Sequence, residues 1–180
     1  MFLWILAGLF VAAIFVYTVT LNDKTADTVQ TNKPADTGTA FTTEEQQQIN
    51  RQLNTARDLL RDNKKEEAID IYKQLSDQNV PQGMFQYANL ALQGKNDRLT
   101  CNDAFELLVK ASDNNYLPAK TTLGFLYAFA NDENTLKQLS YYARCVFPSN
   151  IPKGAHLLME STLQGDVTAA QWLDKLNAKQ

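Results

Sequence analysis

An internal repeat constrains the fold of this chain more than any other feature of its sequence. When residues 66–91 are shifted by 36 positions, they lie over residues 102–127. The matching pairs are Ala68 with Ala104, Ile71 with Leu107, Tyr72 with Leu108, Ser76-Asp77 with Ser112-Asp113, Asn79 with Asn115, Tyr87 with Leu123, and Leu90 with Leu126. Self-similarity at a period of about 20–50 residues is typical of arrays of supersecondary units that share one core.

A third copy spans residues 152–176, shifted by a further 50 positions. Its matching pairs are Leu107-Leu108 with Leu157-Leu158, Asn115 with Gly165, Ala119 with Ala169, and Leu123 with Leu173. The second spacing exceeds the first by 14 residues, and these fall around residues 131–147. We expect an inserted helix and loop there, on one edge of the array.

Apolar residues recur at helical spacing along the repeats. Ile49, Leu53, Ala56 and Leu60 are separated by 4, 3 and 4 positions, which places them on one face of a helix. Thr42, three residues before Glu45, predicts a capping box at the start of this helix, and Asp62-Asn63 ends it. A second helix follows, with Ala68, Ile71, Tyr72 and Leu75 predicted to face inward.

No strand-like alternation interrupts the pattern, so the fold class predicted for residues 42–180 is all-α. We expect a short α-solenoid of about three and a half helix hairpins, because no single hairpin can bury its own apolar face. Ala68, Ala104, Ala111 and Ala119 would let neighbouring helices approach closely.

Two fragments resemble Sel1-like repeats: LLVKASDNNYLPAKTTLGFLYA and LLMESTLQGDVTAAQWL. The residues that match the family pattern are Lys110-Ala111, Ala119, Leu123-Gly124 and Tyr127. Residues 56–75 equally resemble the related tetratricopeptide (TPR) repeat. The first and third copies depart from the pattern, with Tyr87-Ala88 and Leu173-Asp174 at the Leu-Gly pair and Ser161 for the family alanine, which leaves the repeat count open. The resemblance covers roughly residues 42–179 and implies protein binding, because some members serve envelope or secretion machines.

Residues 1–21 contain no charged side chain and are long enough to cross a bilayer as a helix. A cleaved signal peptide is the alternative, but no basic residue precedes the run and Thr18-Val19-Thr20 is a poor cleavage site. We therefore expect a single-pass transmembrane signal-anchor helix, followed by a flexible, polar linker over residues 22–41.

The charges beside the apolar run bear on the orientation of this anchor. Lys24 and Lys33 follow the apolar run but are mixed with aspartates, so the positive-inside bias is small. The usual arrangement for such an anchor places the C-terminal domain in the periplasm of a bacterium, tethered to the inner membrane.

The two cysteines, Cys101 and Cys145, form a possible disulfide that would pin the insertion to the neighbouring turn. The alternative is a pair of buried thiols in a reducing compartment, so the bridge is conditional on export.

The sequence predicts no enzyme. The one histidine, His156, has no evident nucleophile or substrate partner, and the acidic pairs 44–45, 66–67 and 132–133 suit helix starts. No phosphate-cradling glycine loop occurs. The net charge of −3 and the scattered basic residues argue against nucleic-acid binding. We expect no cofactor, no metal and no small-molecule substrate.

Two functions remain after these exclusions. The first is an adaptor or scaffold that binds cell-envelope proteins, for example as an accessory of a type VI or other secretion system. The predicted groove residues are Gln86, Asn89, Thr122 and Phe125. The second is a structural subunit assembled through the transmembrane helix, where Gly8 and Ala12-Ala13 offer small contact residues. No motif supports a peptidoglycan-active enzyme.

Overall fold

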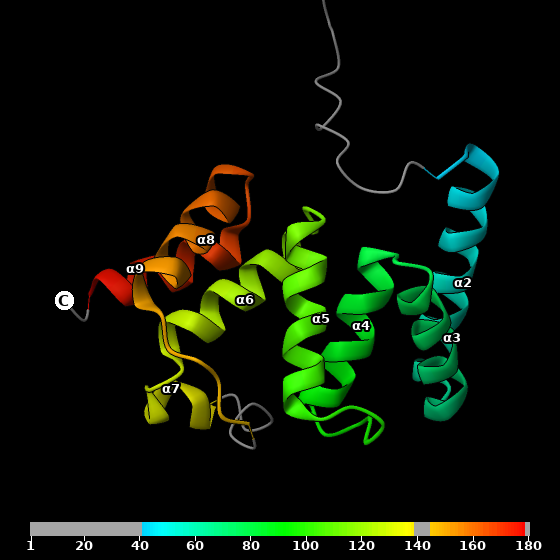
Figure 1. The fold of residues 1–180 in the computed structure, drawn as a ribbon, viewed down its shortest axis with the longest axis horizontal. Coiled ribbons are helices and arrows are strands. Elements are labelled where there is room, and N and C mark those ends of the chain that lie inside the picture. Colours follow the sequence, from blue (N-terminus) through cyan, green and yellow to red (C-terminus); the bar gives the residue numbers. More distant parts are fainter. Residues whose placement is uncertain (1–40, 139–144, 179–180) are drawn as a thin grey trace, which may run out of the picture. The chain divides into compact units, whose positions relative to one another are not determined.

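The computed structural model describes residues 41–138 and 145–178, and this part of the chain folds into α-helices joined by turns (Figure 1). The predicted all-α class is confirmed for these residues. The helices are α2 (Thr43–Arg61), α3 (Lys65–Asp77), α4 (Pro81–Leu92), α5 (Cys101–Asp113), α6 (Leu117–Phe129), α7 (Glu133–Gln138), α8 (Ile151–Leu163) and α9 (Val167–Asn177).

The expected anchor (residues 1–21) and all of the expected linker except Phe41 lie outside the described residues. None of the described helices combines the length and the apolar composition that crossing a bilayer requires. Phe41, the last residue of the predicted linker, is half-buried and packs against the core beneath α2 and α3. It therefore belongs to the helical domain.

The helix boundaries repeat with the spacing found in the sequence. Adding 36 to the bounds of α3 gives those of α5, and adding 50 to the bounds of α5 gives those of α8. The second helices follow the same rule, since α4, α6 and α9 begin at Pro81, Leu117 and Val167. The predicted self-similarity is thus confirmed as three hairpins: α3–α4, α5–α6 and α8–α9. Helix α2 precedes them, and α7 lies in the expected insertion.

The three hairpin turns share one backbone geometry. Asn79, Asn115 and Gly165 have positive φ values of 58°, 57° and 88°. In each turn the residue that follows the positive-φ residue donates its backbone N–H to the carbonyl of the residue five positions before it. Val80, for example, donates to Leu75 at 3.0 Å. This arrangement is a Schellman motif, and its left-handed residue favours Asn and Gly. The sequence predicted these polar residues as helix ends, and their conformation explains why they recur.

The same positions are buried in successive hairpins. The buried sets are Ala68, Ala104 and Gly154; Tyr72, Leu108 and Leu158; Leu75, Ala111 and Ser161; Gly83, Ala119 and Ala169; and Leu90, Leu126 and Leu176. The expectation that Ala68, Ala104, Ala111 and Ala119 lie between helices is confirmed. Ile71, predicted to face inward, is only half-buried, and Ile69 is buried instead.

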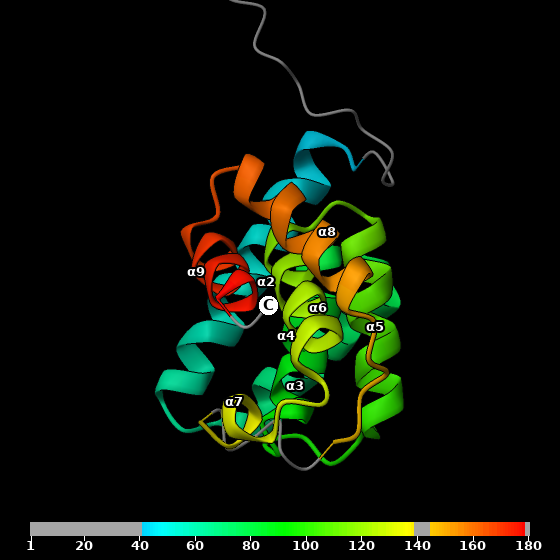
Figure 2. The same cartoon turned by 90° about the vertical axis from the view of Figure 1, so that its left-hand side faces the viewer.

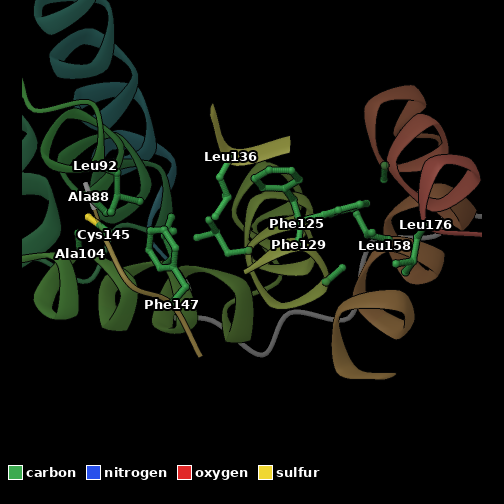
Figure 3. Close-up of a cluster of buried hydrophobic side chains, with 14 residues drawn as sticks. Ala88, Leu92, Ala104, Phe125, Phe129, Leu136, Cys145, Phe147, Leu158 and Leu176 are labelled. Carbon is green, nitrogen blue, oxygen red and sulfur yellow. The ribbon is translucent and has the colours of Figure 1, made fainter. Parts of the chain in front are cut away.

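Each helix from α2 to α5 packs against the next, and α6 also packs against α8 and α9. The largest core cluster therefore draws on several hairpins at once. Figure 3 shows Ala88, Leu92 and Ala104 on one side of it, Phe125 and Phe129 in the middle, and Leu158 and Leu176 on the other side.

Helices α6 and α8 cross at two glycines. A Cβ added to Gly154 would lie 2.6 Å from the Ala128 nitrogen and 2.7 Å from the Gly124 oxygen, so the backbones themselves are in contact. In the third hairpin the position of Gly124 is taken by exposed Asp174, since 124 plus 50 is 174, and no described helix packs beyond α9. A small residue, Ala88 or Gly124, occupies this position where another hairpin packs, and the exposed Asp174 of the third copy has no such neighbour among the described helices.

We expect Gly154→Ala to destabilise the fold by about 1–3 kcal/mol, because the added methyl meets backbone that cannot move aside alone. Urea unfolding followed by far-UV circular dichroism measures the change. The control His156→Ala alters an exposed position on the same helix and should stay within about 0.5 kcal/mol of the wild type. Wild-type stability in Gly154→Ala would contradict the close crossing.

Two capping boxes begin α2 and α5. Thr42 and Glu45 form the predicted one, and Thr100 and Asp103 form a second that the same spacing in the sequence would have indicated. Hydrogen bonds from the backbone N–H and the hydroxyl of Thr42 lower the pKa of Glu45 below its ordinary value of 4.5. Those from the hydroxyl and the backbone of Thr100 lower the pKa of Asp103 below 3.8.

A lowered folded-state pKa gives these carboxylates a stabilising contribution that is present above the unfolded pKa and lost as the pH falls through the folded pKa. Asp103→Asn should therefore be less stable than the wild type near neutral pH, and the difference should shrink between about pH 6 and pH 2. Urea unfolding across this range tests the prediction. Glu106→Gln, exposed in the middle of α5, is the control and should show a smaller pH-dependent difference.

Candidate functional site

Two of the predicted groove residues lie on α4, and two lie at the matching positions of α6. Gln86 corresponds to Thr122 and Asn89 to Phe125 under the 36-residue shift. Gln86, Asn89 and Thr122 are half-buried at the surface, whereas Phe125 is only 3% exposed. The structure therefore separates this set into three surface residues and one core residue.

Four amide side chains line the open face of α4. Gln82, Gln86, Asn89 and Gln93 are spaced by 4, 3 and 4 positions, and each is half-buried. The remaining faces of the helix bury Gly83, Met84, Tyr87, Ala88, Leu90 and Leu92. We call the four amides the amide stripe. Sequence reasoning found its two central members, and the helical spacing of Gln82 and Gln93 could have added the other two.

Aromatic groups lie beside the amide stripe, and a cationic group lies near one of them. Phe85 packs edge-on against Tyr116, with ring centroids 5.4 Å apart. Burial raises the pKa of Tyr116 and of Tyr72, and the guanidinium of Arg57 opposes the rise in both. Arg57, from α2, thus lies near the hydroxyls of a residue on α3 and of the residue preceding α6.

The chemistry of this face suits binding. Each amide side chain carries both a hydrogen-bond donor and an acceptor, as a peptide backbone does. Tyr, Phe and Arg are the residue types enriched in protein interfaces. The residues named for the stripe and its flanks include no carboxylate, thiol or histidine.

Phe125 is covered because α9 folds over this part of α6. Its ring stacks on Phe129 at 5.3 Å between centroids and lies 4.5 Å from the ring of Trp172 on α9. In the first hairpin, the positions of Phe125 and Phe129 are held by Asn89 and Gln93. The prediction of Phe125 as a groove residue is therefore wrong, since the open face on α4 is a closed aromatic contact on α6.

Cys101 and Cys145 are joined as a disulfide, with Cα atoms 5.6 Å apart. Cys101 is the first residue of α5, and Cys145 is buried in the core cluster beside Phe147 (Figure 3). The bond thus ties the segment between α7 and α8 to the start of α5. Residues 139–144, where the sequence predicted a continuing helix, lie outside the described residues.

The other singled-out residues have local partners. His156 is exposed on α8, with its Nδ1 3.8 Å from Glu160 Oε1. The acidic pairs stand at helix starts, as expected: residues 44–45 in α2, residues 66–67 in α3, and residues 132–133 at α7. Tyr127 accepts a hydrogen bond from Lys153 Nζ at 3.1 Å and is otherwise buried.

Comparisons of the chain with known protein families, with curated proteins and with solved structures each found no match. The case for a function therefore rests on the repeat geometry and on the amide stripe.

Replacing both cysteines by serine should lower the stability of the oxidised protein by about 4 kcal/mol, because the bond closes a loop of about 45 residues in the unfolded chain. Urea unfolding with and without reductant measures this. Reductant should destabilise the wild type and leave the double variant unchanged. A wild-type protein insensitive to reductant would contradict the bond.

Proposed function

We propose that this protein is a membrane-anchored adaptor that binds a segment of another cell-envelope protein through a short solenoid of Sel1-like or TPR-like hairpins. One observation carries the proposal. The repeating hairpins leave one face of α4 partly exposed, and that face presents four half-buried amide side chains in a line. Stacked hairpins of this kind characteristically bind partners along such a shared surface.

The dimensions of the amide stripe suit an extended peptide. Gln82 and Gln93 are 11 residues apart, so the stripe is roughly 16 Å long at the rise of an α-helix. About five residues of extended chain cover the same length. The amides would pair with backbone N–H and C=O groups, while Phe85, Tyr116 and Arg57 at the flanks would receive side chains of the partner.

Two further features support a position in the bacterial envelope. Residues 1–21 have the length and composition of an inner-membrane anchor, and residues 22–41 those of a tether. The Cys101–Cys145 disulfide is of the kind that persists in the periplasm. An accessory role in a type VI or similar secretion system is one assignment compatible with this architecture.

The test compares cross-linked complexes recovered from membranes with full-length wild type and with Gln86→Ala/Asn89→Ala. Each hydrogen bond lost contributes about 0.5–1.5 kcal/mol, so affinity for the partner should fall about tenfold. Gln171→Ala/Asn177→Ala removes two exposed amides from α9 and serves as the matched control.

If both double variants recover as much of the cross-linked partner as the wild type does, the amide stripe is not the binding surface. A version in which a cleavable signal replaces residues 1–21 separates the adaptor from the structural-subunit alternative. The adaptor keeps its partner in soluble form, whereas a subunit assembled through its membrane helix loses its complex.

A further inference from the structure

The outward face of α8 differs from the same face of the two helices that it repeats. On α3 the outward positions hold Glu66, Asp70, Lys73 and Asp77, and on α5 they hold Asn102, Glu106, Val109 and Asp113. On α8 the corresponding residues are Pro152, His156, Met159 and Leu163. The charged character of the first hairpin has been lost in the third.

In the turn after α8, the exposed and buried positions also exchange their polar and apolar residues relative to the turn after α3. In the first hairpin Asp77 is exposed and Val80 is buried. In the third hairpin Asp166, at the position of Val80, turns to the protein, where it accepts a hydrogen bond from Thr121 Oγ1 at 2.6 Å and caps α9. Leu163, three residues before Asp166, and Val167, the residue after it, face outward instead and are 82% and 70% exposed.

Met159, 48% exposed, lies one turn before Leu163 on the same face of α8. We call Met159, Leu163 and Val167 the apolar corner. From residue 161 to residue 173 the only charged side chain is Asp166, which is already hydrogen-bonded. The corner itself is apolar. Of the charged residues beside it in the sequence, Asp166 is hydrogen-bonded and Glu160 forms an ion pair with Lys120 at 3.1 Å.

The apolar corner and the first turn of α2, where the tether enters, lie at the same edge of the helical domain but toward opposite ends of its long axis (Figure 1). In both views the first turn of α2 and the α8–α9 turn lie at the upper edge of the helical domain (Figure 1, Figure 2). The twenty residues 22–41 can span at most about 70 Å. A domain held by a membrane helix at residues 1–21 thus has this edge within reach of the bilayer.

We infer that the apolar corner inserts into the surface of the lipid bilayer that anchors the chain, and so sets the orientation of the helical domain. The inference rests on the anchor in the proposed function. Aliphatic side chains without an aromatic or arginine anchor are a poor protein hot spot but suit the acyl boundary of a membrane. Because the tether keeps the domain at high local concentration, a patch of three residues suffices.

The experiment uses the full-length protein reconstituted into phosphatidylcholine vesicles that contain nitroxide-labelled lipid. A bimane fluorophore is attached at Gln164→Cys, an exposed position between Leu163 and Val167. The native cysteines form a disulfide, and wild type treated with the same reagent gives the background. We expect lipid quenching at this probe, and its loss to background when Leu163→Ser/Val167→Ser is added.

Two other probes provide the controls. Gln78→Cys occupies the corresponding turn of the first hairpin, and Asp97→Cys lies in the loop between α4 and α5. Neither should be quenched. Equal quenching at Gln78→Cys and Gln164→Cys, or quenching that survives the double serine substitution, would overturn the inference.

Flotation of the same vesicles distinguishes failure of the inserted corner from failure of the membrane anchor. Protein that floats with the vesicles, but whose Gln164→Cys probe stays unquenched, overturns the inserted corner and leaves the anchor intact. Protein that fails to float overturns the anchor, and the inference falls with it.

Discussion

The close approach of helices at small residues is the constraint on which the rest of this structure depends. Where α6 crosses α8, Gly124 and Gly154 bring the two backbones into contact, and Ala104 and Ala68 occupy the position of Gly154 in the earlier hairpins. This proximity lets the larger side chains of successive hairpins enter one core. Dispersion contacts and apolar burial both require such proximity. A single methyl added at the crossing would therefore disturb the packing between the hairpins.

The same packing determines what remains for binding. Helix α4 lies between α3 and α5, and its buried residues are committed to those two neighbours. One face is left over, and polar amides occupy it without the cost of burying them fully. On α6 the equivalent face is closed by Trp172, so the aromatic residues there stabilise the fold instead. Equivalent positions are thus partly exposed or packed according to whether a later helix covers them.

Much of this architecture could be predicted from the sequence, because local rules determine it. The capping box at Thr42, the left-handed turns at Asn79 and Asn115, and the matched helix bounds all depend on short-range chemistry. Phe125 could not be placed in the same way. Its burial depends on how far α9 folds over α6, which is a property of hairpin packing and leaves no mark in the helical spacing. The replacement of Asn89 by phenylalanine at the equivalent position was the available signal.

Asp174 has a consequence for how such a chain can lengthen. Repeat proteins grow by duplication of a hairpin, and each new copy must dock on the last helix of the previous one. At the end of this array the docking position carries a carboxylate, and exposed Asn177 stands one turn further along α9. A duplicated hairpin added after α9 would bury an unpaired charge. An exposed carboxylate at this position thus disfavours both the docking of a further hairpin on α9 and the association of copies through this face.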